Sequence, residues 1–287
     1  TDYIDNNQTF PIEIFWRNRG RFDVQETTIN ISANYPQIIN WSKTAQANGL
    51  KYKNNELIID QDKTNKLSNI KTGASDGLTV MIYTNTNFNF SSALGSYLEL
   101  TPKVETKIFG LNSAYIQKGE SDRATIAGQI NFATQARYYT DSGDQIGLGP
   151  LPPQVGKTNK YYIYVQITPL FQSIKNLSFE TTLPVGVELT GRDSVTVGQN
   201  IEFNKNNRKI TWKHDYLTAN NLAGLYFEAQ SIPNNNQVGQ PLQLTNQLKF
   251  NATDVTTGKI IMVTNVGLTN ILPSDDVGSK KGYKVIE

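Results

Sequence analysis

The sequence predicts an all-β protein made of two antiparallel β-sandwiches in tandem. Three observations lead to this fold class. Apolar and polar residues alternate with the period of two that a half-buried strand requires. Clusters of Asn, Gly, Pro and Thr separate these segments at the spacing of turns. The motifs of the first half of the chain return in the same order in the second half, which indicates two related domains.

The repeat sets the predicted domain boundaries. Four segments return in order: 31–36 as 179–184, 57–59 as 210–212, 77–80 as 224–227, and 95–101 (GSYLELT) as 239–245 (GQPLQLT). A repeat of this length is a duplicated domain rather than a solenoid unit of a few dozen residues. We therefore predict a first sandwich over residues 1–119 and a second over residues 120–287, which includes a short C-terminal tail.

The predicted strands follow from alternation between turns. Alternation is clearest at 161–168, where Tyr161 and Ile163 face one side and Tyr162 and Tyr164 face the other. Further strands are expected at 10–17, 27–34, 56–60, 77–84 and 97–109 in the first copy, and at 124–139, 176–183, 194–203, 209–213, 222–230, 241–253 and 259–264 in the second. The strand at 124–139 has no counterpart in the first copy, so we expect that sandwich to lack its opening edge strand.

Composition excludes several classes of function. Only 18% of the residues are charged, and abundant Asn, Thr, Ser and Gln suit turns and the exposed faces of sheets. The formal net charge is +2 with no long run of basic residues, so the chain has no basic face for nucleic acid. The chain has no cysteine, which excludes disulfides and thiolate metal sites.

The same features indicate an exported protein. A sandwich of this size buries enough apolar surface to be stable without disulfides, as exported bacterial proteins often are. The sequence shows no apolar stretch of about twenty residues and no signal peptide. Because the chain begins with Thr1 rather than Met, we expect a processed chain or a fragment whose parent protein is membrane-anchored upstream. The expected location is extracellular, at the cell surface.

Three segments of the second copy carry a resemblance to a known family. They are 149–168 (GPLPPQVGKTNKYYIYVQIT), 180–191 (ETTLPVGVELTG) and 207–217 (NRKITWKHDYL). They resemble the repeat domain of bacterial and archaeal surface proteins often called DUF11, an immunoglobulin-like sandwich. In that pattern Gly and Thr precede a Y-x-I strand, then an LP-x-GV motif and a Trp strand follow. The matching positions here are Gly156, Thr158, Tyr161, Ile163, 183–187 and Trp212.

The resemblance extends over residues 125–287 and is weak in the first copy, where Tyr35-Pro36 lacks the Gly-Val that should follow. The GPLPP segment and a closing T-D-x-x-T-G at 253–258 are similar to those of large uncharacterised surface proteins of candidate-phylum bacteria. Those proteins typically carry an amino-terminal membrane helix and end in a short acidic tail, which 272–278 resembles. The resemblance implies immunoglobulin-like sandwiches and supplies no catalytic residues.

Asp141 and Asp144 are the candidate metal ligands. The tetrapeptide D-S-G-D places two carboxylates on a loop that Gly143 can bend, and calcium prefers about six to eight oxygen ligands. The same tetrapeptide is also a good turn between strands. Both interpretations stay open. The single histidine, His214, is expected beside Trp212 on a strand face, while Asp215 points to the other face, so a catalytic triad is not expected.

Exposed aromatic residues are the candidate contacts for a glycan or a partner. Tyr162 and Tyr164 share the outer face of one strand, and Phe88 and Phe90 are expected in an exposed loop. Flat rings can stack on sugars, but they also pack against neighbouring strands or domains. We favour packing for these residues.

The expected function is therefore non-enzymatic: a structural stalk or adhesion module of an exported bacterial protein. The alternative is a carbohydrate-binding module that uses the exposed aromatic residues. The expected partner is a surface protein or a glycan, and no cofactor is expected apart from the calcium alternative. Functional residues are expected where the two copies differ, at 141–153 and in the loops around Trp41 and Phe88.

Overall fold

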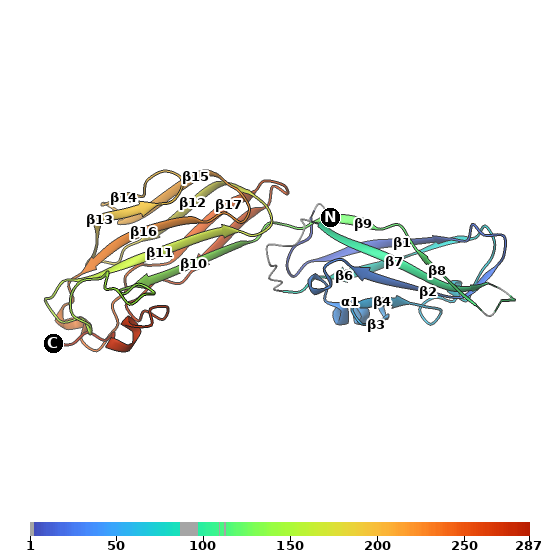
Figure 1. Ribbon diagram of the computed structural model, residues 1–287, viewed down its shortest axis with the longest axis horizontal. Coiled ribbons are helices and arrows are strands. Elements are labelled where there is room, and N and C mark those ends of the chain that lie inside the picture. The colour runs from blue at the N-terminus through green and yellow to red at the C-terminus, as the bar shows by residue number, and fades with distance from the viewer. Residues whose placement is uncertain (1–2, 87–96, 109, 112) are drawn as a thin grey trace. The chain divides into compact units, whose positions relative to one another are not determined.

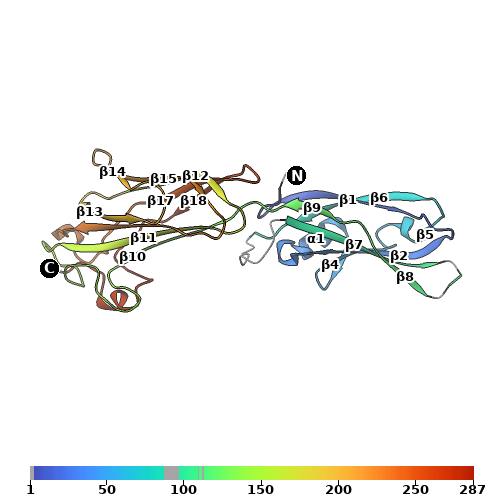
Figure 2. The same ribbon diagram turned by 45° about the horizontal axis from the view of Figure 1, so that its top comes forward.

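The computed structural model describes residues 3–86, 97–108, 110–111 and 113–287. The chain divides into two compact units, Thr1–Ala127 (unit 1) and Gly128–Glu287 (unit 2). Each is built from antiparallel sheets (Figures 1 and 2). The prediction of an all-β fold of two antiparallel β-sandwiches is confirmed. None of the helices within the described residues is long and apolar enough to cross a membrane.

Unit 2 is a sandwich of a four-stranded and a five-stranded sheet. The four-stranded sheet has the order β10 (Ile130–Arg137), β11 (Asn159–Pro169), β16 (Ala223–Ser231) and β13 (Val187–Val195). The five-stranded sheet has the order β14 (Glu202–Asn204), β15 (Lys209–Leu217), β12 (Ile174–Thr182), β17 (Leu248–Asp254) and β18 (Ile260–Asn265).

Alternation along β11 produces the core of unit 2. The inward side chains of Tyr161, Ile163, Val165 and Ile167 are each 0% exposed. They pack with Phe179, Trp212 and Phe250 from the facing sheet. Neighbours β10 and β16 flank β11 on both sides, so this strand has no open edge.

Three strands predicted in the second copy are not continuous. The segments expected at 124–139 and 241–253 are interrupted at 126–129 and 241–247, and their regular strands are β10 and β17. The third is 194–203. Residues 194–203 were expected to be continuous, but they contain the end of β13, a bend over 196–199 and the start of β14. Gly198 takes a φ of +84°, outside the strand region, and the chain crosses from one sheet to the other there. The segments before and after this crossing both alternate between apolar and polar residues, because both face the same core. In the sequence they therefore look like a single strand.

In unit 1 the larger sheet holds most of the strands. Its main path is β3 (Lys51–Lys53), β4 (Glu56–Ile59), β2 (Val24–Ala33), β7 (Tyr97–Ile108) and β8 (Ala114–Lys118). Two further short strands join it, β5 (Asn69–Ile70) beside β2 and β9 (Asp122–Thr125) beside β7. Residues 120–127, which the repeat assigned to the second domain, thus belong to unit 1.

The smaller sheet of unit 1 contains β1 (Thr9–Arg17) and β6 (Ser75–Tyr83) within the described residues. Phe10 and Ile14 on β1 and Val80 and Ile82 on β6 are at most 8% exposed, facing the larger sheet. The segments matched by the sequence repeat lie in strands of the same order: β2 with β12, β4 with β15, and β6 with β16. Their origin by duplication stays a prediction.

Where unit 2 has β13, unit 1 has the helix α1 (Trp41–Asn48). The sequence predicts a loop around Trp41, and the structure corrects this to a helix. The Asn40 side chain caps its start by accepting from the Lys43 N–H, and Gly49 ends it in the left-handed conformation with a φ of +61°. The Asn48 side chain, on the last turn, bonds to Met81 on β6: its Oδ1 accepts from Met81 N at 2.9 Å and its Nδ2 donates to Met81 O at 2.8 Å.

Asn48 thus does for the outer edge of β6 what a neighbouring strand would do. We expect Asn48→Ala to lower the free energy of unfolding by about 1–2 kcal/mol, because two backbone groups lose their partners. Gln46→Ala, at an exposed position of the same helix, is the matched control and should change it by less than about 0.5 kcal/mol. Urea unfolding measures both. Equal effects of the two substitutions would contradict this role.

Candidate functional site

The predicted site residues lie in two places in unit 2. Asp141 and Asp144 occupy the turn after β10, and Tyr162 and Tyr164 lie on the outer face of β11. Phe88 and Phe90 fall outside the described residues. Arg137 links the two places, because its guanidinium pairs with Asp141 and it lies opposite Tyr162 in the sheet.

The D-S-G-D segment forms a tight turn. Thr140 N donates to Asp144 O at 2.8 Å, Gly143 N donates to Thr140 O at 3.0 Å, and Gly143 takes a φ of +87°. The Asp141 carboxylate accepts from the Arg137 guanidinium and its side chain is 89% exposed. Asp144 is exposed as well. Among the residues that the structure describes, no group of three or more His, Cys, Asp or Glu side chains is arranged to hold a metal ion.

Calcium binding at this turn stays a prediction. The geometry of the turn indicates what a binding experiment should show. Because Asp141 is already paired with Arg137 and a third carboxylate is not assembled there, we expect the same melting temperature in calcium chloride and in a chelator. Differential scanning calorimetry makes this comparison. A rise in calcium that Asp144→Ala abolishes would instead establish a site.

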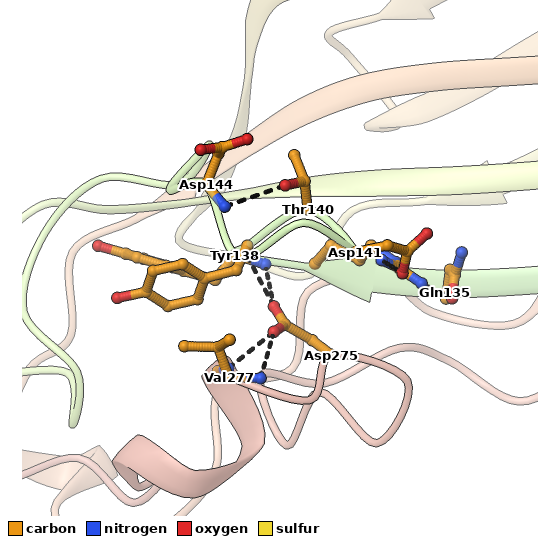
Figure 3. Close-up of polar contacts among 10 residues, drawn as sticks. Gln135, Tyr138, Thr140, Asp141, Asp144, Asp275 and Val277 are labelled. Carbon is orange, nitrogen blue, oxygen red and sulfur yellow. Dashed lines mark hydrogen bonds and ion pairs between the residues drawn. The ribbon is translucent and has the colours of Figure 1, made fainter.

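A different aspartate organises this end of unit 2. Asp275 is 1% exposed, and its carboxylate accepts four backbone N–H bonds (Figure 3). Oδ2 accepts from the N–H groups of Tyr138 and Tyr139, both at 2.7 Å. Oδ1 accepts from Val277 at 3.2 Å and from Gly278 at 2.7 Å. The carboxylate therefore joins the C-terminal segment to the end of β10.

Asp254 has the same role at the start of unit 2. It is 0% exposed, and its Oδ2 accepts from the N–H of Gly128. Its Oδ1 accepts from Thr256 N at 2.8 Å and from Thr257 N at 3.1 Å, which closes the turn after β17. Both aspartates are buried and hydrogen-bonded on both carboxylate oxygens, as a buried charge requires.

Sequence reasoning missed the anchoring role of these two aspartates. A signal was present, because Asp-Val-Thr-Thr-Gly at 254–258 is typical of a turn in which the aspartate side chain bonds the backbone two residues on. The long-range partners, Gly128 and Tyr138, leave no local pattern. They become visible only when the strands are placed.

The outer face of the four-stranded sheet carries a tyrosine cluster of Tyr162, Tyr164 and Tyr226. Tyr164 lies opposite Tyr226 on the neighbouring strand, and their rings meet edge to face with centroids 5.1 Å apart. Burial of the Tyr164 ring raises the pKa of its phenol. A groove of about 360 Å³ beside Tyr162 and Tyr226 is completed by residues 191–194 of β13, where the pairing with β16 is interrupted by a register shift.

A buried ion pair lies next to this cluster. Glu228, opposite Tyr162 on β16, is 2% exposed although it belongs to the outer face of the sheet. Its carboxylate lies 3.4 Å from Lys160 Nζ and 3.8 Å from an Arg192 guanidinium nitrogen. Rings next to charged side chains can stack on a sugar, and the cross-strand contact of Tyr164 also stabilises the sheet by itself. Glycan contact by Tyr162 and Tyr164 stays a prediction.

The single histidine lies apart from these groups. His214 packs against Trp212 on β15, with ring centroids 5.9 Å apart, and the adjacent Asp215 is exposed. Trp212 itself is 1% exposed and donates from its indole N–H to Val197 O at 3.2 Å. His214 thus borders the core through its ring contact.

Comparison with known proteins finds similarity only among solved structures. No protein-family model matches the chain, and no curated protein matches it. The full-length major pilin SpaD of Corynebacterium diphtheriae matches 86% of this chain over 59% of its own, with 11% identity and a TM-score of 0.33. The D312A form of BcpA, the major pilin subunit of Bacillus cereus, matches 91% of this chain over 69% of its own, with 9% identity and a TM-score of 0.33.

Two further structures span the range of coverage. A putative membrane-anchored protein of C. diphtheriae matches 100% of this chain over 93% of its own, with 8% identity and a TM-score of 0.27. Three N-terminal domains of the type V pili tip protein Mfa5 of Porphyromonas gingivalis match 36% of this chain, with 11% identity and a TM-score of 0.30. The match spans 22% of the Mfa5 chain and 59% of the SpaD chain, less than two thirds of either.

The anchoring role of Asp275 predicts a specific loss of stability. Asp275→Asn turns one acceptor into an NH₂ donor that faces backbone N–H groups, so we expect unit 2 to lose about 2–3 kcal/mol of unfolding free energy. Asp276→Asn, at the exposed neighbouring position, makes the same change of charge and should cost less than about 0.5 kcal/mol. Denaturant titration measures the unfolding free energy of both variants. Similar losses of unfolding free energy in the two variants would contradict the anchoring role of Asp275.

Proposed function

We propose that this chain is a non-enzymatic structural module of an exported bacterial surface protein, in which the sandwiches act as spacers that bear tension. The single observation that carries the proposal is the way both ends of unit 2 are tied into its body. The chain enters unit 2 at one end of the sandwich and its C-terminus lies at the opposite end (Figure 1). A spacer transmits force between such ends.

The start of unit 2 is held by a buried side chain. The N–H of Gly128 donates to the carboxylate of Asp254, and a Cβ at residue 128 would come 2.7 Å from that carboxylate, so only glycine fits. From there the chain continues directly into β10, which pairs with β11 along its length. Tension on this end is therefore applied first to a buried hydrogen bond and then to a full strand ladder.

The C-terminal segment is held by backbone hydrogen bonds to two loops. Ile286 N donates to Pro153 O at 2.8 Å, and Val155 N donates to Ile286 O at 3.0 Å. Val285 exchanges bonds with Gln240 O at 3.0 Å and Gly239 N at 2.9 Å, and its side chain is 1% exposed. The bridges to Gln154 and Val238 are parallel. Pulling along such a segment loads several bonds at once rather than one after another.

The sequence adds support for the location. The resemblance of residues 125–287 to surface-protein repeats, the absence of cysteine and the polar, weakly charged composition fit an exported protein. The contacts of His214 and Asp141 are with Trp212 and Arg137 respectively, which fits a structural role better than a catalytic one. Adhesion belongs to this proposal, with a surface protein or glycan as the partner and the tyrosine cluster as the face most suited to it.

Pulling the full chain by its two ends in a single-molecule force experiment tests this function. Unit 2 has 160 residues (287 − 128 + 1), so its unfolding should add on the order of 500 Å of chain. We expect Ile286→Pro, which removes the N–H bonded to Pro153, to lower the unfolding force of unit 2, whereas Ile286→Ala keeps that N–H and should not. Equal forces for the two variants, or unfolding of wild-type unit 2 without measurable resistance, would refute a load-bearing role.

A further inference from the structure

Unit 1 is a sandwich with one open edge next to its core. Within the described residues, its smaller sheet consists of β1 and β6. The outer edge of β6 is closed by the helix α1: Asn48 bonds to Met81, and the N–H of Tyr83 donates to the Thr44 hydroxyl oxygen. No strand of the described chain pairs with the other edge of β1. An unpaired edge of this kind is a template for another strand.

The bonds of Asn48 also identify which backbone groups of β1 are open. Met81 uses its N–H and C=O for Asn48, so these groups point away from β1. Met81 lies opposite Pro11, so Pro11 and every second residue from it direct their backbone groups to the open edge. Glu13 and Phe15 therefore offer N–H and C=O groups there, while Pro11 offers a carbonyl only. Ile12 and Ile14 bond to β6.

A groove of about 920 Å³ runs along this edge. Its floor is apolar, formed by inward side chains of β2 and β7, and its far wall is the segment 117–124. Four apolar residues that line it are only half buried: Ile12, Trp16, Leu100 and Val104. The rim carries both signs of charge, including Glu13, Arg17, Glu120 and Arg123. The groove thus combines a row of free backbone groups with an apolar floor.

Unit 2 shows what fills the corresponding place. Ile14 lies opposite Leu78, and Val165 lies opposite Leu225, which the sequence repeat matches to Leu78. Ile14 thus corresponds to Val165. Trp16, which lies two residues further along β1, corresponds to Ile167. In unit 2 the open side of this strand is covered by β10, which runs antiparallel to it and places Phe132 opposite Ile167.

Coverage by β10 changes the burial of the strand that it joins. With β10 in place, Ile163 and Ile167 are 0% exposed, whereas the matching Ile12 and Trp16 are partly exposed. On its far side β10 is held by Asn265, whose Nδ2 donates to Phe132 O and to the Thr134 hydroxyl, both at 3.0 Å. A strand with apolar residues at alternate positions is therefore the occupant that this geometry accommodates.

We propose that the groove beside β1 binds an extended segment of a partner polypeptide, which completes the smaller sheet of unit 1 as an added antiparallel strand. The bound segment bonds to the backbone of Glu13 and Phe15 and places alternate apolar side chains over Ile12, Trp16 and Leu100. Specificity comes from those side chains, because the backbone bonds are common to all sequences. This interaction does not depend on the load-bearing function proposed above.

The probe is a synthetic peptide with the sequence of Ile130–Tyr138, INFATQARY, added to the full chain. Amide hydrogen exchange by NMR should show slow exchange at Ile12 and Ile14 with or without peptide, because these groups bond to β6. Glu13 and Phe15 should exchange fast in the protein alone and at least about tenfold more slowly with peptide. A peptide with aspartate in place of Ile130 and Phe132 should leave them fast.

Two substitutions at one position test the role of the open edge. Glu13→Pro removes an N–H from that edge and leaves the bonds to β6 in place, so it should weaken peptide binding by about tenfold or more. Glu13→Ala keeps the N–H and should bind as the wild type does. Circular dichroism and thermal melting establish that both variants are folded, and if Glu13→Pro is not, the amide-exchange comparison decides alone.

Three results would overturn the proposal. One is unchanged exchange at Glu13 and Phe15 with the INFATQARY peptide. Another is equal peptide binding by folded Glu13→Pro and Glu13→Ala. The third is slow exchange at Glu13 and Phe15 in the protein alone, together with a dimer mass in sedimentation, which would assign the edge to pairing between two copies of this chain.

Discussion

A β-sandwich excludes water from its core only when each sheet is wide enough to cover the inner face of the other, and the rest of this structure depends on that constraint. In unit 2 four strands face five, and the inward residues of β11 are fully buried between them. In unit 1 the pair β1 and β6 faces a much wider sheet. The difference between the units is thus one of sheet width, and both the helix α1 and the groove beside β1 follow from it.

Buried carboxylates satisfy backbone N–H groups that apolar packing cannot satisfy. Loops at the two ends of unit 2 have no ladder to satisfy their N–H groups, and buried carboxylates accept those bonds instead. Asp254 and Asp275 each join a local turn to a backbone segment more than a hundred residues away in sequence. Because a carboxylate accepts in several directions, one side chain fixes both the turn and the distant strand. These hydrogen bonds fix the position of each turn relative to the distant strand, which apolar burial alone would not do.

The sequence predicted what depends on periodicity and missed what depends on long-range pairing. Alternation along 161–168 predicted the inner face of β11, and turn residues marked most strand ends. The strand expected at 194–203 was wrong because both halves alternate toward one core. The helix at Trp41 is only eight residues long, so its period is too short to recognise, although Asn40 and Gly49 are good caps. The roles of Asp254 and Asp275 depend on Gly128 and Tyr138, whose neighbourhood no local pattern encodes.

One residue on the edge of β1 limits how that edge can grow. Fibrillar sheets form when an uninterrupted row of donors and acceptors stacks identical strands without end. Pro11 breaks that row on its open side, and the ring stands where an adjacent backbone would approach. Pro11 therefore leaves one gap in the row of donors along this edge, which disfavours endless stacking of identical strands and leaves the backbone groups of Glu13 and Phe15 available.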